Sequence, residues 1–367
     1  MRLTSELMRS ELRNKMSEKL QKYELLGKLC NLNGLSGEED EVRDFIKGEI
    51  EKYCDEIIVD NLGNLLAHKK GKKTPPKTIM FQAHMDETGY YIKKIDDDGG
   101  LRIDSIGVPA NVTPGKTVLV RSTVGDTPTY IKGVIGVCPI HLASNAGEVP
   151  SIKSLCVDIG AKKKEEAEGK VCVGDSVYFN GEFGEFGDFI KAKAIDDRAG
   201  CFAMMRLIET ELEYDTWFAF TVQEETGCRG SKVAAHRIKP AISFTLEGTT
   251  AADIGGVEYD GKVCIVGNGV AVSFMDRSTI YNPRFIKAVT DIATEAGVKW
   301  QTKTFVSGGN DAGNIQRSAS GALVCTLSIP VRYLHSRISV CAPEDTDSMF
   351  DFCKAVSASM DKLFDIN

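Results

Sequence analysis

The spacing of apolar residues predicts alternating helices and strands over most of the chain. In residues 36–53, apolar side chains recur every three or four positions, which is the period of an amphipathic helix. Ser36, followed three residues later by Glu39, predicts a capping box at the start of that helix. A β-hairpin is predicted for residues 56–70, and a buried strand for residues 78–87, where an apolar run ends in polar side chains.

The pattern changes between residues 89 and 179. Short runs of alternating apolar and polar residues, such as "GYYIKKID" and "TYIKGVIGV", are separated by Gly, Pro and Asp turns. This pattern predicts a small all-β domain, either a barrel or a sandwich. Beyond residue 180, strands alternate with helices again, including a long helix over 283–296 and a last one over 343–364. Such alternation predicts an open α/β sheet with helices on both faces.

We therefore expect an α/β fold in two parts. Residues 1–88 and 180–367 would form one α/β sandwich domain, and residues 89–179 an inserted, barrel-like β domain. A length of 367 residues agrees with two unequal domains, because it exceeds that of one ordinary small domain.

Composition narrows the choice of partners and location. A net charge of −7 disfavours nucleic acid and anionic membranes, which are bound by basic surfaces. No apolar run approaches the ~20 residues that a membrane span needs. Eleven cysteines without a CxxC pair favour reduced thiols in a cytosolic protein. The sequence thus predicts a cytoplasmic protein whose partners are neither nucleic acid nor membrane.

Residues of the metal-binding types occur at the ends of five predicted elements: His84 with Asp86, Asp196 with Asp197, Glu224 with Glu225, Glu247, and His335. In an open α/β sheet, ligands gather beyond the carboxyl ends of the strands. Taken singly, each group has an ordinary structural explanation, such as a helix cap for the Asp pair or a solvated strand end for the Glu pair. Taken together, two histidines and several carboxylates favour a divalent-metal site with nitrogen and oxygen ligands.

Seven longer motifs occur in order along the chain: "AHMDETGYYI", "GVIGVCPIHL", "VDIGAKKKEEAE", "KAIDDRAGC", "FTVQEETGCRG", "GGNDAGNIQ" and "IPVRYLHS". In this combination the chain resembles the tetrahedral and glutamyl aminopeptidases, a family of dinuclear metallo-aminopeptidases in which some members carry an endoglucanase label. The resemblance implies a hydrolase that removes N-terminal residues from short peptides with two divalent ions per subunit, zinc or else cobalt or manganese. It also implies homo-oligomers, either dimers or hollow twelve-subunit tetrahedra, assembled through the inserted domain.

The resemblance assigns the metal ligands residue by residue. His84 and Glu247 would hold one ion, Glu225 and His335 the other, and Asp196 would bridge the two. Family members often carry Asp at the position of Glu247, which keeps the carboxylate but has a shorter reach.

Further roles follow from the same resemblance. Asp86 would accept the second ring N–H of His84 and fix its tautomer, and Glu224 would be the general base. A non-proline cis peptide bond is implied after Asp196. The segment 307–313 resembles a loop beside the substrate pocket, and its candidate substrate-binding residues are Gly308, Gly309, Asn310 and Asp311. The alternative for this segment is a plain glycine turn before a helix.

Two other functions remain open at this point. Paired carboxylates also hydrolyse glycosidic bonds, a reaction that requires no histidine. The chain would be a non-catalytic metal-binding or assembly protein if Glu247, in place of Asp, prevented the metal site from catalysing a reaction. The preferred N-terminal residue is open as well, and Arg229 is a candidate partner for an acidic side chain.

Overall fold

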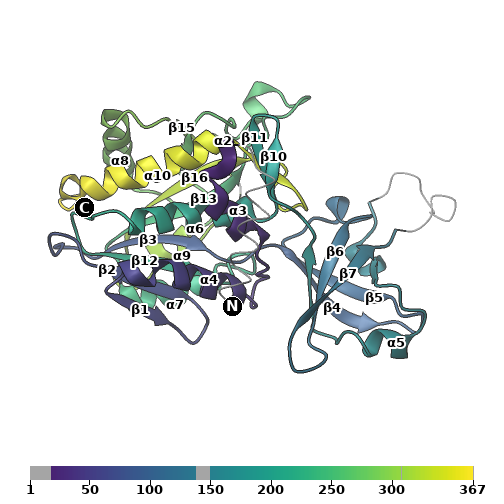
Figure 1. Ribbon diagram of the computed structural model, residues 1–367. Helices are drawn as coiled ribbons and strands as arrows, with labels where there is room; N and C mark the ends of the chain where they lie inside the picture. The colour runs from purple at the N-terminus through teal and green to yellow at the C-terminus, as the bar shows by residue number, and fades with distance from the viewer. Residues whose placement is uncertain (1–17, 138–148, 307, 367) are drawn as a thin grey trace.

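The computed structural model describes residues 18–137, 149–306 and 308–366. Figure 1 shows two bodies, a larger one that combines helices with a broad sheet and a smaller β-barrel beside it. The fold class expected from the sequence is therefore confirmed. No helix among the described residues is long and apolar enough to span a membrane.

The larger body is built on one eight-stranded sheet, in the order β1-β2-β12-β3-β13-β16-β14-β15. The strands are Glu56–Val59 (β1), Leu65–Lys69 (β2), Thr216–Thr221 (β12), Ile79–His84 (β3), Ile242–Thr250 (β13), Leu323–Val331 (β16), Val270–Val272 (β14) and Trp300–Thr302 (β15). The four inner strands β12, β3, β13 and β16 run parallel to one another. Their carboxyl ends therefore open at the same edge of the sheet.

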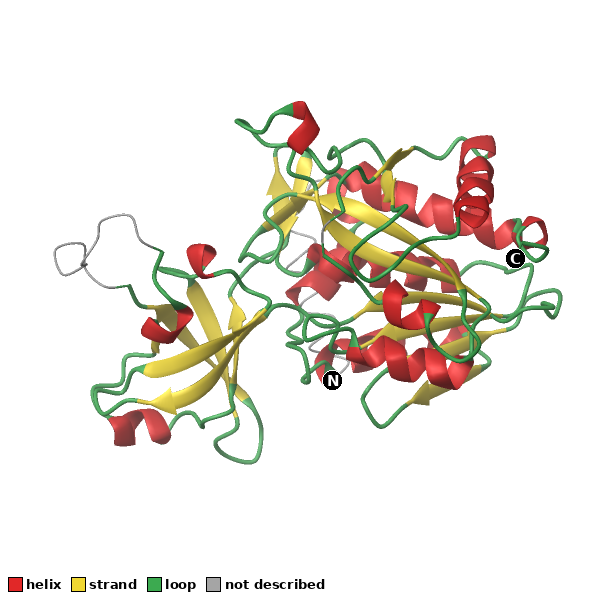
Figure 2. Ribbon diagram, turned by 180° about the vertical axis from the view of Figure 1, so that it is seen from behind, coloured by secondary structure: helices red, strands yellow, loops and turns green. Residues whose placement is uncertain are grey.

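Helices cover both faces of this sheet, as the alternation predicts (Figure 2). The helices are Glu18–Gln21 (α2), Glu24–Asn31 (α3), Asp40–Ile50 (α4), Ile195–Ile208 (α6), Arg229–Ile238 (α7), Pro283–Glu295 (α8), Ala312–Gln316 (α9) and Pro343–Ala358 (α10). Helix α10 packs against both α6 and α8, and α7 packs with α9 against other parts of the sheet. Phe244 of β13 lies between Phe81 and Phe285, with ring centroids 5.0 and 6.0 Å away. Aromatic contact thus joins the centre of the sheet to α8.

The smaller body is a closed six-stranded barrel, in the order β4-β5-β8-β7-β6-β9. Its strands are Gly89–Ile95 (β4), Leu101–Ile106 (β5), Thr117–Ser122 (β6), Thr129–Ile135 (β7), Cys156–Asp158 (β8) and Ser176–Phe179 (β9), and a short helix, Lys164–Glu168 (α5), lies between the last two. In β6, the buried Val118 and Val120 alternate with partly exposed neighbours, because side chains of a strand point to opposite faces. Of the two alternatives that the alternating runs predict, the structure has the barrel and not the sandwich.

A three-stranded sheet that follows the barrel in the chain packs on the larger body, because Ile190 and Cys341 belong to the core of that body. It is formed by Gly184–Phe186 (β10), Phe189–Ala192 (β11) and Ser339–Cys341 (β17). Only two residues separate the end of β11 from the start of α6. Strand β11 therefore helps to place the two aspartates at the start of α6 at the edge of the main sheet.

The predicted capping box is wrong. Helix α4 begins at Asp40, and Glu39 at its N-cap makes no side-chain capping bond. The Glu39 carboxylate instead accepts hydrogen bonds from the backbone N–H groups of Gly37 and Gln223, 2.7 and 3.0 Å away. The Ser36 hydroxyl donates to Asp86 at 2.5 Å. Both residues connect this segment to the strand ends of the sheet, a long-range use that local sequence spacing does not reveal.

Phe244→Ala should lower the free energy of unfolding by about 3–5 kcal/mol, because it leaves a cavity between two aromatic rings. Both tryptophans, Trp217 and Trp300, belong to the main sheet, so their fluorescence during urea unfolding follows this body. Phe186→Ala is the matched control, since Phe186 is 55% exposed. Equal shifts for the two variants would contradict the assigned core.

Candidate metal centre

The candidate ligands converge at the edge where the parallel strands end. His84 is the last residue of β3 and is in register with Thr221, the last residue of β12. Glu247 lies on the neighbouring strand β13, in register with Ser328 of β16. Glu247 does not end its strand as expected from the sequence, because β13 continues for three residues to Thr250. The carboxylate of Glu247 therefore projects from the face of a strand.

Asp86 holds the strand ends together. Its side chain is fully buried and accepts hydrogen bonds from the backbone N–H groups of Glu224 and Glu225, at 3.0 and 3.1 Å. The ring nitrogen Nδ1 of His84 lies 3.3 Å from the Asp86 carboxylate and 3.1 Å from its backbone oxygen. Both acceptors favour a hydrogen on Nδ1, which leaves Nε2 of His84 free to face the site.

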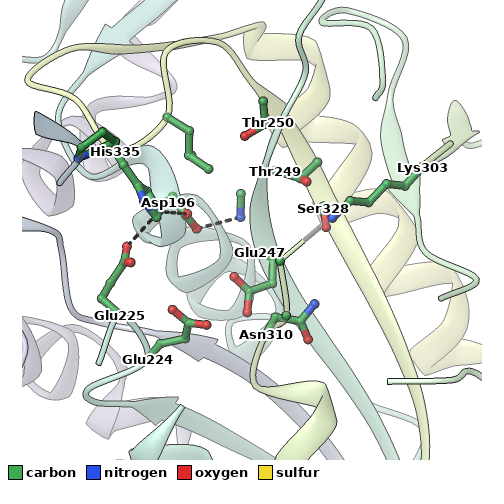
Figure 3. Close-up of a pocket in the computed structure, with 15 residues that line it drawn as sticks. Asp196, Glu224, Glu225, Glu247, Thr249, Thr250, Lys303, Asn310, Ser328 and His335 are labelled. Atoms are coloured by element: carbon green, nitrogen blue, oxygen red, sulfur yellow. Dashed lines mark hydrogen bonds and ion pairs between the residues drawn. The ribbon is translucent and has the colours of Figure 1, made fainter. Parts of the chain in front are cut away.

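The two neighbouring glutamates lie in a turn after β12 and not in the strand itself. Gln223, directly before them, has a left-handed backbone conformation with φ 58°. The alternation of strand side chains lapses there, so both carboxylates face the cavity (Figure 3). Glu225 Oε1 lies 3.4 Å from His335 Nε2, whereas Glu224 Oε1 accepts a hydrogen bond from the Cys228 thiol at 3.2 Å.

Asp196 is the central carboxylate of the group. Its Oδ1 lies 3.3 Å from His84 Nε2, and its Oδ2 lies 3.7 Å from His335 Nε2. The backbone N–H of Gly248 donates to the same Oδ1 at 3.0 Å. The peptide bond between Asp196 and Asp197 is cis, as the resemblance implies. Asp197 turns into its own helix, where it accepts the N–H of Gly200 at 2.9 Å.

The donor set fits divalent ions. His84, Asp196 and Glu225 offer one ligand atom each within 4.8 Å of one another, and so do His84, Asp197 and Glu247. Glu247 Oε1 is buried without a hydrogen-bond partner among the described residues, an arrangement that a bound cation would satisfy. Nitrogen from histidine and oxygen from carboxylates suit zinc and related ions.

Burial and mutual attraction together set the charges of this cluster. Burial raises the pKa of Glu225 to about 7 and that of Glu247 well above its usual range. Burial alone would lower the pKa of His335, but the Asp196 hydrogen bond and the Glu225 charge outweigh it and raise the pKa to about 9. Burial also disfavours the Asp196 anion, yet the two histidines keep its pKa below the ordinary value. The cluster therefore retains positive charge tightly, either as protons or as metal ions.

A cavity of about 380 Å³ opens beside these ligands. Gly308, Gly309 and Asn310 line it, as the sequence suggests. Asp311 does not line it, and its buried carboxylate instead accepts hydrogen bonds from Gln82 and Thr221.

The cavity is also lined by a basic residue that the sequence pattern does not indicate. Lys303 is the only lysine or arginine among the fifteen lining residues, and its side chain runs toward Ser328 (Figure 3). Thr249 and Thr250 line the same region. Arg229, the candidate named from the sequence, begins α7 and does not line the cavity. A single lysine after a short strand carries no local motif, so only the fold brings it to the site.

Comparison with known proteins agrees with this geometry. Residues 63–352 match the model of the family described as M42 glutamyl aminopeptidase. A putative aminopeptidase of Acetivibrio thermocellus is 35% identical, over 93% of this chain and 98% of its own. The lysyl aminopeptidase of Pyrococcus furiosus is 31% identical, over 91% of this chain and 96% of its own.

Solved structures give the same result. Aminopeptidase APDkam598 of Desulfurococcus kamchatkensis superposes with a TM-score of 0.87 at 34% identity, covering 92% of this chain and 94% of its own. The TET1 peptidase of Pyrococcus horikoshii, which can assemble into a tetrahedron or a large octahedral shell, gives 0.79 at 32% identity, with 91% and 98% covered. The chain therefore belongs to the M42 glutamyl aminopeptidase family and is a hydrolase that acts on peptide bonds.

Proposed function

We propose that the chain is a metal-dependent aminopeptidase that holds two divalent ions. His84 and Glu247 would bind one ion, His335 and Glu225 the other, and Asp196 would bridge them. The observation that carries this proposal is Asp196, whose two oxygens face one histidine ring each at 3.3 and 3.7 Å. Divalent ions at such a site lower the pKa of water and polarise a carbonyl group.

Glu224 is the proposed general base. It lines the cavity among the ligands, but its oxygen bonds to the Cys228 thiol and not to a histidine. Burial raises its pKa well above the usual value, with the neighbouring carboxylates adding to the shift. A raised pKa makes the Glu224 carboxylate a stronger base, so it would take a proton from the attacking water and pass it to the leaving amine.

The charge distribution in the cavity supports exopeptidase activity on short peptides. Four carboxylates line the metal end, where a free α-amino group would be attracted: Asp196, Glu224, Glu225 and Glu247. Lys303, which lines the same cavity, would pair with an acidic side chain of the N-terminal residue. The volume of about 380 Å³ suits one residue and its neighbour better than a folded chain.

We further propose that the chain forms homo-oligomers in the cytoplasm, with zinc, cobalt or manganese as the ions. The TET1 peptidase, of which 98% is covered, can assemble into a tetrahedron or a large octahedral shell. Ten cysteines in the described part of the chain are free thiols, which suits a reducing compartment.

Glu224→Gln should reduce kcat at least ~100-fold while two ions still bind, because the amide fills the same space but cannot accept the proton. The measurements are hydrolysis of aminoacyl p-nitroanilides and zinc titration by calorimetry. Glu211→Gln, at a surface position with an 88% exposed side chain, is the control. Full activity of Glu224→Gln would refute its role as the base.

Removal of metal by exhaustive dialysis against a chelator should abolish peptidase activity, and zinc, cobalt or manganese should restore it. The ions should also raise the unfolding temperature, because ligands that bind the folded chain stabilise it. Activity that survives metal removal would favour a carboxylate-only mechanism such as glycoside hydrolysis. A chain that binds metal but cleaves none of the aminoacyl p-nitroanilides would instead fit a non-catalytic assembly protein.

Lys303→Met should lower kcat/KM for glutamyl and aspartyl substrates by about 10- to 100-fold, because a hydrogen bond to a charged group contributes that factor to binding. Rates with leucyl substrates should change little, and Lys303→Glu should shift preference toward lysyl substrates. Lys354→Met, at an exposed position on α10, is the matched control. An unchanged glutamyl-to-leucyl ratio in Lys303→Met would exclude Lys303 as the specificity residue.

A further inference from the structure

One proposed metal ligand contacts the barrel as well as the domain that carries it. His335 follows β16 of the main sheet, and its ring nitrogen Nδ1 lies 3.0 Å from the backbone oxygen of Gly107. Gly107 directly follows β5 of the barrel. A carbonyl oxygen only accepts hydrogen bonds, so it selects the His335 tautomer with hydrogen on Nδ1. The lone pair on Nε2 then faces Asp196 and Glu225, at 3.7 and 3.4 Å.

The barrel itself fixes the position of this carbonyl. On one side of Gly107, the Ser105 hydroxyl donates to the backbone oxygen of Val108 at 2.8 Å and accepts from its N–H at 3.1 Å. On the other side, the Thr113 hydroxyl donates to the backbone oxygen of Pro109 at 2.9 Å. Thr113 in turn accepts a hydrogen bond from Tyr90, a fully buried residue of the barrel core.

Close packing explains why glycine occupies this position. Gly107 has a left-handed backbone with φ 69°, which residues with a Cβ rarely adopt. A Cβ here would lie 2.5 Å from Thr88 Cγ2 and 3.0 Å from Glu225 Oε2. The loop therefore contacts both Glu225 and His335, the two residues assigned to the same ion.

The other histidine has an independent support. Nδ1 of His84 faces Asp86, which follows β3 of the main sheet. The His84 side chain is only 1% exposed, whereas that of His335 is 32% exposed. The outer ring nitrogens of the two histidines thus have partners in different parts of the molecule.

We propose that the barrel is a working part of the metal centre: the Gly107 carbonyl positions His335 and thereby sets the occupancy of the ion held by His335 and Glu225. This inference rests on the proposed two-ion function and goes beyond it. It assigns the inserted domain a role in metal retention within each subunit, and Gly107 and Ser105 become positioning residues.

The test is zinc titration of the metal-free full-length chain by isothermal calorimetry, with Gly107→Ala, Ser105→Ala and Ser122→Ala. Gly107→Ala and Ser105→Ala should weaken one of the two zinc ions by about 10- to 100-fold, the usual effect of losing support for a metal-bound histidine, and leave the other unchanged. Ser122→Ala is the matched control, because its hydroxyl also bonds a barrel carbonyl, that of Lys170, at 2.6 Å, without contacting this loop. It should bind both ions as the wild type does.

Wild-type affinity for both ions in Gly107→Ala and Ser105→Ala would overturn the inference, and so would equal weakening of both ions. If Gly107→Ala does not fold, Ser105→Ala decides, since Ser105 bonds Val108 and not a ligand. Failure of the wild-type chain to bind two ions would instead reject the two-ion function, so the two failures are distinguishable. The visible spectrum of bound cobalt gives a second readout, in which one of two cobalt signals should be lost selectively.

Discussion

The carboxylate of Asp86 is the constraint on which the site depends. Without exposure to water, it accepts hydrogen bonds from Ser36, from the backbone at Glu224 and Glu225, and faces His84. A buried charge is stable only when it is paired and hydrogen-bonded, so these segments must come together around it. The turn after β12 is thereby fixed to the end of β3, and adjacent glutamates that would diverge in a strand share one cavity.

The electrostatics of the site follow from placing several acids in one buried space. The three carboxylates assigned to metal, Asp196, Glu225 and Glu247, carry three negative charges against four positive charges from two divalent ions. Two ions would therefore nearly neutralise the cluster, which burial alone would force to take up protons. Lys303 lines the same cavity and adds one positive charge to it.

The sequence predicted those parts of the site that depend on element ends, and missed those that depend on tertiary contacts. Parallel strands were readable from alternation with helices, and that was enough to bring His84 and Glu225 to one edge. The capping box failed because Ser36 and Glu39 bond to distant partners. Gly107 acts through a main-chain carbonyl, which leaves no mark on residue type. Lys303 was equally invisible, because one lysine in a loop has no pattern until the fold places it.

The continuation of β13 past Glu247 fixes the spacing between two positions that line the cavity. Side chains two residues apart on a strand share a face and stand about 6.6 Å apart. Glu247 and Thr249 both line the cavity, and the distance between them is therefore set by a regular strand and not by a loop. The strand therefore sets the distance between these two cavity positions, and a change in a loop elsewhere in the cavity would leave that distance the same.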